Sequence, residues 1–229
     1  MAIKNNIKSL KEEIFEICNR INRNPNDILI IAIAKTFTYG QILEAFEYGI
    51  TNIGENRVQE AREKYEILRT RDIKWHLVGY LQRNKVKKAL EIFDLIHSVD
   101  SIRLAEEIDK RARDIGKRQK VLIEVNISGE ASKYGLSLDS VIPLLEKIQG
   151  FPNIAVKGLM TIAPFYEDPE RCRPIFRRLR ELKEEIEMHG FEGVKMEYLS
   201  MGMTNDYRIA IEEGSNMVRI GRRIFGERK

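Results

Sequence analysis

The sequence predicts an α/β protein that folds as a single (β/α)₈ barrel of the TIM type with an extra N-terminal helix. Short apolar runs alternate with longer amphipathic stretches, and eight such runs follow one another from Ile28 onwards. Regular alternation of strands and helices requires a parallel sheet. The length of 229 residues is close to the roughly 250 residues of a typical barrel of this kind. We therefore predict one domain over residues 1–229.

The first elements are predicted from their local patterns. A helix is expected at about 5–22, where isoleucines and a leucine recur at helical spacing. The run 28–34 is apolar throughout, which is typical of a strand buried on both faces. Thr38 and Gln41 have the spacing of a capping box for the next helix, which is predicted to end at Gly49.

The other elements follow the same alternation. Further strands are predicted at 52–54, 74–79, 95–99, 121–127, 156–162, 196–200 and 217–221. Helices are predicted near 56–69, 82–90, 101–116, 139–149, 170–189 and 204–213. Pro169 suits a helix N-terminus, whereas Pro174 predicts a late start or a kink in that helix. An open, doubly wound sheet is the alternative, although no G-x-G-x-x-G follows the first strand.

Composition excludes several classes of protein. The chain has 39 Lys and Arg against 35 Asp and Glu, and basic runs such as 177–180 lie beside acidic residues, so no nucleic-acid partner is expected. Cys18 and Cys172 are far apart and predict no metal site. Charged residues interrupt the N-terminal segment, and no apolar run is long enough to span a membrane. We expect a cytoplasmic protein without a membrane partner.

Lys35 is the most informative position, because it ends the first predicted strand. It shares a strand face with Ile31 and Ile33. In a barrel it would lie at the C-terminal rim, where barrel enzymes have their active sites. Apolar neighbours desolvate an amine, which lowers its pKa and makes it a nucleophile towards aldehydes. A lysine that merely ends a strand and reaches water is an equally good interpretation.

Arg219 lies inside the last predicted strand, on the face shared by Met217 and Gly221. A guanidinium cannot be neutralised, so it needs a partner there. A nearby carboxylate is the commoner partner, and a bound ligand is the alternative. Gly221 would let a ligand approach the backbone closely, and barrels often bind phosphate with the loops after their last two strands.

The seventh predicted strand leads into Ser200-Met-Gly-Met-Thr204, followed by Asn205 and Asp206. Small and hydroxyl residues can surround an anion with backbone N–H groups and a helix N-terminus. An ordinary turn with Thr204 or Asn205 as the N-cap is the alternative. Because strands one and eight are neighbours in a closed barrel, a phosphate site here would lie close to Lys35.

Other polar positions carry weaker signals. Asn56 follows the second predicted strand and has the simple alternative of capping a helix. His76, in the third strand, is interpreted as a hydrogen-bonded core residue, and His97 and His189 carry no functional signal. Met160, on the sixth strand, is interpreted as packing.

Ten short blocks along nearly the whole chain carry a family resemblance. They are Ala32-Ile-Ala-Lys-Thr36, Gly54-Glu-Asn-Arg-Val-Gln-Glu60, Trp75-His-Leu-Val-Gly79, Leu81-Gln-Arg-Asn-Lys85, Val125-Asn-Ile-Ser128, Lys133-Tyr-Gly135, Gly158-Leu-Met160, Leu199-Ser-Met-Gly-Met203, Val218-Arg-Ile-Gly221 and Ile224-Phe-Gly226. In this order they resemble the pyridoxal-phosphate homeostasis proteins, small proteins related to the barrel domain of alanine racemase.

The resemblance implies a cofactor, pyridoxal 5′-phosphate, and a set of residues that hold it. Lys35 matches the lysine that forms the Schiff base, and Arg219 matches the arginine that faces the pyridine nitrogen. The other implied cofactor-binding residues are Asn56, which lines the site, and Ser200, Gly202, Gly221 and Arg222, which lie on the phosphate-holding segments.

The chain departs from the family pattern at two places. Arg222 stands where a small or hydroxyl residue is common, so a side-chain hydroxyl bond to the phosphate would be lost. Phe37-Thr38 replaces the more usual Lys-Pro, with little expected consequence.

The resemblance also implies carriage rather than catalysis. An arginine beside the pyridine nitrogen disfavours its protonation and weakens the ring as an electron sink. Racemases of this type add a second base from a C-terminal domain, for which too few residues follow Gly221 here. We expect a monomeric, non-enzymatic protein with no catalytic residues that supplies cofactor to dependent apoenzymes in vitamin B6 homeostasis. The alternatives are a weak racemase or transaminase on the same cofactor, and a cofactor-free Schiff-base aldolase or sugar-phosphate barrel.

Overall fold

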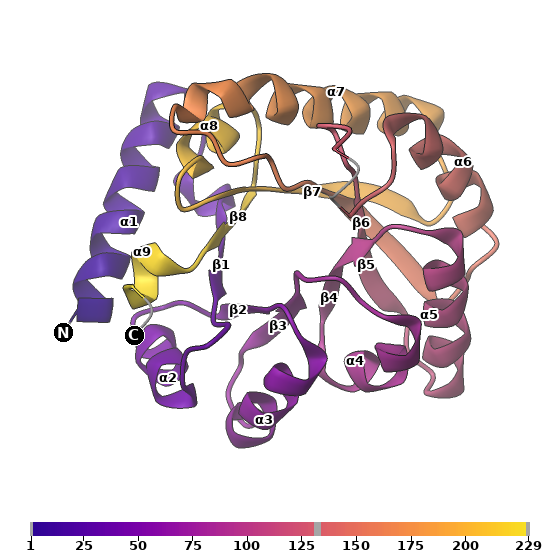
Figure 1. Cartoon of the computed structure of the whole chain (residues 1–229), viewed down its shortest axis with the longest axis horizontal. Helices are drawn as coiled ribbons and strands as arrows, with labels where there is room; N and C mark the ends of the chain where they lie inside the picture. The colour runs from indigo at the N-terminus through magenta and orange to yellow at the C-terminus, as the bar shows by residue number, and fades with distance from the viewer. Residues whose placement is uncertain (1, 131–133, 228–229) are drawn as a thin grey trace.

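The computed structural model describes residues 2–130 and 134–227, so Lys133 of the sequence blocks lies outside the described residues. Eight parallel strands pair in sequence order and close into a barrel, and helices surround it (Figure 1). The strands are β1 Leu29–Ile33, β2 Asn52–Glu55, β3 Lys74–Leu77, β4 Leu95–Val99, β5 Gln119–Glu124, β6 Ile154–Met160, β7 Val194–Met203 and β8 Met217–Ile220. The predicted barrel is confirmed.

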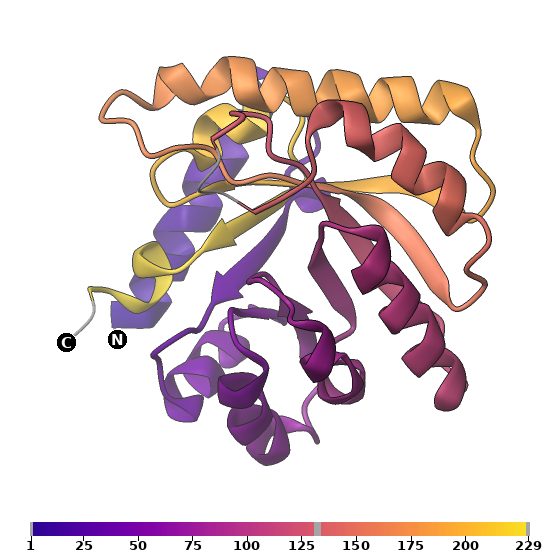
Figure 2. The same ribbon diagram turned by 45° about the vertical axis from the view of Figure 1, so that its right-hand side comes forward.

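Pairing between β1 and β8 closes the sheet, with Ile31 opposite Arg219. The alternative of an open sheet is therefore wrong. The described helices are α1 Ala2–Arg20, α2 Tyr39–Glu47, α3 Val58–Leu68, α4 Val86–Ile92, α5 Ile102–Asp114, α6 Leu138–Ile148, α7 Arg173–His189, α8 Tyr207–Glu212 and α9 Arg222–Phe225. Three short 3₁₀ helices are η1 Pro25–Asp27, η2 Arg83–Lys85 and η3 Pro169–Cys172. Figure 2 shows the helices packed around the outside of the strands.

Local signals account for several helix ends. Gln41 N donates to Thr38 Oγ1 and Thr38 N donates to Gln41 Oε1, which confirms the capping box before α2. Helix α7 starts late, so Pro174 falls in its first turn, where its missing N–H has no helical partner to lose. The two elements that periodicity missed, η1 and α9, have three and four residues.

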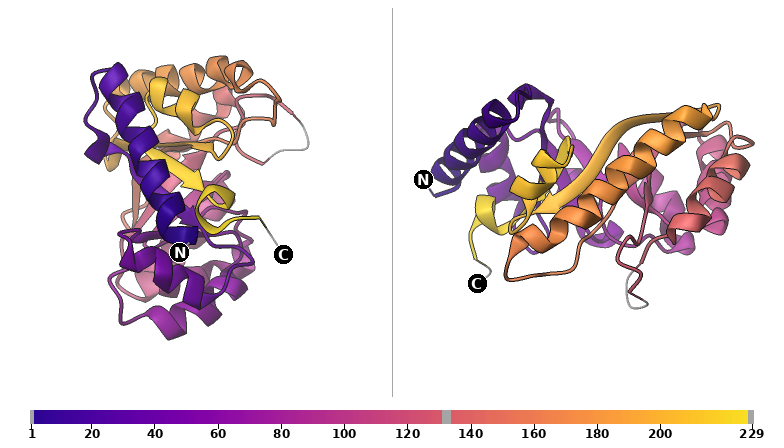
Figure 3. Two further views of the ribbon diagram at one scale, coloured as in Figure 1. Left: turned by 90° about the vertical axis from the view of Figure 1, so that its left-hand side faces the viewer. Right: turned by 90° about the horizontal axis from the view of Figure 1, so that it is seen from above.

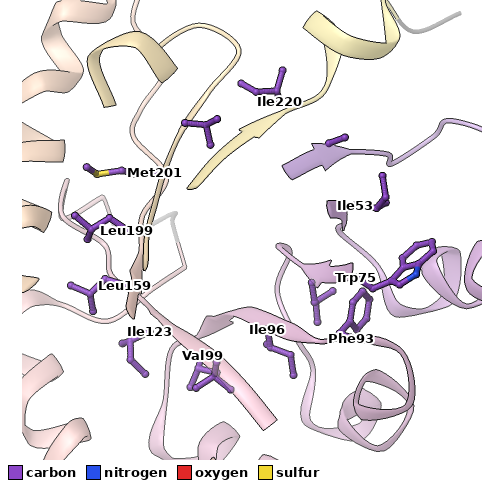
Figure 4. Packing of buried hydrophobic residues seen from close by; sticks show 14 of the residues in the cluster. Ile53, Trp75, Phe93, Ile96, Val99, Ile123, Leu159, Leu199, Met201 and Ile220 are labelled. Carbon is purple, nitrogen blue, oxygen red and sulfur yellow. The ribbon is translucent and has the colours of Figure 1, made fainter. Parts of the chain in front are cut away.

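Two apolar layers stabilise the barrel. The outer layer lies between the strands and the helices, as Figure 4 shows for side chains that include Trp75 and Phe93. The inner layer fills the barrel itself and consists of Ile31, Leu95, Leu122, Met160 and Met217. Met160 is fully buried there, so its interpretation as a packing residue is confirmed.

The first helix and the last helix lie side by side (Figure 3). Asn6 Nδ2 of α1 donates to the carbonyl oxygen of Ile224 in α9 at 3.0 Å. This contact joins α9, which directly follows β8, to α1. None of the described helices combines the length and apolar character that crossing a bilayer requires.

Candidate functional site

A cavity of about 450 Å³ opens at the C-terminal ends of the strands. Its lining includes Lys35, Thr204, Arg219, Gly221 and Arg222, which come from the ends of β1, β7 and β8. The sequence predicted that a phosphate site after the last two strands would lie close to Lys35, and four of the seven predicted site residues line this one cavity. Its volume suits a small-molecule ligand.

Lys35 leaves β1 through a strained turn. Thr36 has a φ of 68°, a region that β-branched residues rarely adopt. Lys64 of α3 donates from Nζ to the carbonyl oxygen of Ala34 at 2.7 Å and to Glu55 Oε1 at 2.6 Å. These contacts hold the peptide that precedes Lys35 and so define where its side chain begins.

The ion pair between Lys64 and Glu55, which lies beside this turn, is buried. Glu55 is completely buried, and its second carboxylate oxygen, Oε2, has no hydrogen-bond partner among the described residues. Burial raises the pKa of Glu55, while the hydrogen bond and charge of Lys64 oppose that shift. The sequence carried no signal for this pair, because Lys64 lies on an amphipathic helix whose other charges face water.

Arg219 is buried at the floor of the cavity, and its partners are not carboxylates. Nη1 donates to the backbone oxygen of Ser200 at 2.7 Å and to Ser200 Oγ at 2.8 Å, and Nη2 donates to the backbone oxygen of Thr161 at 2.7 Å. Burial lowers the pKa of Arg219 to about 10, against the opposing charges of Asp206 and Glu124. The guanidinium is therefore still a cation at neutral pH.

Three of the predicted site residues do not line this cavity. Ser200 is fully buried inside the barrel, and its hydroxyl is engaged with Arg219 and His97. Gly202 in β7 has a φ of 93°, and a Cβ there would lie 2.6 Å from Cβ of Ala210, so the glycine lets β7 and α8 approach closely. Asn56 lines a second cavity, of about 590 Å³, between the ends of β2 and β3.

The histidines divide between core and surface. His76 is buried and hydrogen-bonded, which confirms its interpretation as a core residue. His97 is also fully buried and bonded to His76 and Ser200, a role that the sequence did not indicate. His189 is exposed at the end of α7.

Thr204, Asp206 and Phe165 also line the cavity, although they were not among the predicted cofactor-binding residues. Thr204 belongs to the segment that follows β7, which the sequence had singled out as a whole. Asp206 accepts a hydrogen bond from the backbone N–H of Met203 at 2.6 Å, and burial raises its pKa. Phe165 is 76% exposed in the segment after β6, where no pattern marked it.

Comparison with known proteins agrees with this geometry. Residues 2–229 match the family described as alanine racemase, N-terminal domain. The pyridoxal phosphate homeostasis protein of Aquifex aeolicus is 45% identical over 218 residues, which are 95% of each chain. The protein of the same name from Vibrio alginolyticus is 38% identical over 231 residues, 99% of this chain and 98% of that one.

The chain belongs to the pyridoxal phosphate homeostasis protein family. Among solved structures, PipY of Synechococcus elongatus with PLP bound matches it with a TM-score of 0.86 and 32% identity. The match covers 98% of this chain and 100% of that one. The family resemblance inferred from the sequence blocks is therefore confirmed.

Proposed function

We propose that this chain binds pyridoxal 5′-phosphate reversibly, as a Schiff base on Lys35, and holds it for delivery in vitamin B6 homeostasis. The observation that carries the proposal is that Lys35, Arg219 and Arg222 line one cavity at the barrel mouth. The names of the curated relatives and the PLP in the PipY structure support it.

The residues present fit this cofactor. Its aldehyde supplies an electrophile, and condensation with the Lys35 amine forms a C=N bond and releases water. Arg219 would face the pyridine nitrogen, and Arg222 would hold the phosphate beside Gly221. A Cβ at Gly221 would lie 3.4 Å from the backbone oxygen of Ile33, so a larger residue would crowd this corner of the cavity. Arg219 and Arg222 supply positive charge to match the negative charge of the cofactor.

The cation at Arg219 favours carriage over catalysis. A guanidinium donates to a ring nitrogen and disfavours a proton on it, which keeps the ring a weak electron sink. Carbanion chemistry on an amino acid is correspondingly disfavoured. The Schiff base is reversible, since water or another amine can displace the lysine. A dependent apoenzyme, whose own lysine is such an amine, is the proposed recipient.

The first test is the visible absorption spectrum of the purified protein with added pyridoxal 5′-phosphate, followed by borohydride reduction and peptide mapping. We expect a yellow band and a reduced adduct on Lys35. Lys35→Arg keeps the charge but cannot form the bond, and Lys74→Arg is a control at an exposed lysine. A yellow Lys35→Arg protein, or a colourless native protein that consumes aldehyde phosphates, would overturn the proposal.

A second experiment separates carriage from catalysis. Alanine labelled with deuterium at its α-carbon is incubated with the loaded protein and, in parallel, with free cofactor. We expect no faster loss of deuterium with the protein, and we expect a cofactor-free transaminase to regain activity when the loaded protein is added. Faster deuterium loss would instead indicate a weak racemase or transaminase.

A further inference from the structure

Five polar side chains form a single chain of hydrogen bonds across the inside of the barrel. The heavy-atom distances are 3.0 Å from Asn52 Oδ1 to His76 Nε2, 3.0 Å from His76 Nδ1 to His97 Nε2, 3.0 Å from His97 Nδ1 to Ser200 Oγ, and 2.8 Å from Ser200 Oγ to Arg219 Nη1. The members come from β2, β3, β4, β7 and β8. We call this chain the barrel relay.

One assignment of protons gives every donor in the barrel relay an acceptor. Arg219 can only donate, so in this assignment Ser200 Oγ accepts from it and uses its own hydrogen for Nδ1 of His97. His97 then carries its hydrogen on Nε2 and donates to Nδ1 of His76. His76 in turn donates from Nε2 to Oδ1 of Asn52, whose Nδ2 donates to Thr51 Oγ1 at 3.2 Å. All donors point the same way, from Arg219 towards Asn52.

In this assignment neither ring has an acceptor for a further proton. An added proton on His97 Nδ1 would face the hydroxyl that already donates to it, and one on His76 Nδ1 would face an N–H. Burial lowers the pKa of His76 to about 3, and burial together with His76 and Arg219 lowers the pKa of His97. Arg219, with Asp206 and Glu124 acting on it from other strands and loops, is then the permanent charge at one end of the relay.

Only one side of the relay meets the cavity. Arg219 is 4% exposed and lines the cavity, whereas His97 and Ser200 are completely buried. Three hydrogen bonds from Nη1 and Nη2 restrict rotation of the guanidinium. Ser200 contributes two of the three acceptors, and its hydroxyl is oriented by His97.

We propose that Ser200, His97 and His76 are positioning residues that hold Arg219 as a fixed donor at the cavity floor, so that the ring nitrogen of a bound pyridine accepts its hydrogen bond and stays unprotonated. This inference rests on the proposed binding of pyridoxal 5′-phosphate. It predicts that the protonation of the cofactor's ring depends on one serine and two histidines that do not touch the cofactor.

The first measurement uses the native protein without cofactor. Long-range ¹H–¹⁵N spectra of the imidazoles, with exposed His189 as an internal reference, report the tautomer of each ring. We expect His76 and His97 both as Nε2–H tautomers that do not titrate through the neutral range. An Nδ1–H tautomer or an imidazolium at either ring would overturn the relay, whether or not the protein binds cofactor.

The second measurement uses Ser200→Ala, Ser200→Thr and the control Ser98→Ala. Ser98 is also fully buried, and its hydroxyl donates to the backbone oxygen of Gly79 at 2.7 Å, so its loss matches Ser200→Ala without touching Arg219. We expect Ser200→Ala to weaken binding of pyridoxal 5′-phosphate about tenfold, as loss of one charge-assisted hydrogen bond does. We also expect ¹⁵N-labelled cofactor to become protonated on its ring at higher pH in Ser200→Ala.

The outcomes separate this inference from the proposed function. Recovery of both readouts in Ser200→Thr, with native values in Ser98→Ala, supports positioning through the hydroxyl. Native affinity and native ring titration in Ser200→Ala would overturn the inference and leave the proposed function standing. A native protein that binds no cofactor would overturn the proposed function, and the tautomer measurement would still decide whether the relay exists.

Discussion

The buried ion pair between Lys64 and Glu55 offers the sharpest test of how the barrel holds Lys35. The side chain of Lys64 is 14% exposed and that of Glu55 is completely buried, and Lys64 also donates to the backbone oxygen of Ala34. Lys64→Met keeps the length and the apolar stem but leaves the carboxylate without a partner. Removing one member of a buried pair costs about 3 kcal/mol of unfolding free energy.

This cost depends on pH in a direction that follows from Glu55. Burial raises its pKa in the folded state above the ordinary 4.5, so the folded protein binds more protons than the unfolded chain and loses stability as pH rises through that interval. Without Lys64 the pKa of Glu55 rises further, so the pH interval over which stability falls becomes wider. The loss caused by Lys64→Met is therefore expected to be smaller at low pH, where Glu55 is protonated, than at high pH, where its carboxylate is ionised.

Urea unfolding of the native protein and Lys64→Met at about pH 5 and about pH 8 measures this difference. Lys74→Met removes an exposed pair with Asp72 and should leave the urea midpoint unchanged at both values. Glu55→Gln combined with Lys64→Met removes the unpaired charge and should recover part of the loss at the higher pH. An equal loss at both pH values, or one below about 1 kcal/mol at the higher pH, would refute the reasoning.

Three further predictions concern the candidate site and the barrel that carries it. Arg222→Ala should weaken binding of pyridoxal 5′-phosphate about tenfold in equilibrium titrations, whereas Arg223→Ala, whose side chain pairs with α1, should not. Relative to the native protein, Glu124→Gln should become more stable by about 2–3 kcal/mol as the pH rises from 4.5 to about 7, as measured in urea titrations. The reason is that burial raises the pKa of Glu124 in the native protein to about 7. Gly158→Ala should lower the free energy of unfolding by at least about 2 kcal/mol in the same assay, since the φ of Gly158 is 146° and a Cβ would lie 1.9 Å from the backbone oxygen of Tyr198. Native affinity in Arg222→Ala would contradict the first prediction. Native stability in Glu124→Gln or in Gly158→Ala would contradict the second or the third.

Local pattern determined the fold class of this protein. Eight apolar runs separated by amphipathic stretches predicted the eight strands that the structure contains, and the helical spacing of isoleucines predicted α1. Such patterns indicate which face of each element is buried, because the period of the apolar residues can be read from residues that are neighbours along the chain. The predicted ends of the strands were less accurate. The fifth strand ends at Glu124 rather than at residue 127, because Asn126 N donates to the carbonyl of Leu136 instead of continuing the strand pairing.

The sequence also singled out the two residues on which the proposed function rests. Lys35 ends an apolar strand, and Arg219 lies inside one, so each position conflicts with burial unless something compensates for its charge. That conflict is visible without coordinates. The groups that compensate for the charge of Arg219 could not be identified from the sequence, because Ser200 lies on β7 and Thr161 directly follows β6.

Only the tertiary structure decided how the polar interior is connected and which residues share a cavity. His97 and Ser200 are 103 residues apart in sequence, and they meet because closure of the barrel places side chains of opposite strands across one interior. Asn56 lies at the same end of the barrel as Lys35 but opens into a different cavity. The register of all eight strands sets these contacts, and register arises from the packing of the whole chain, which no local pattern records.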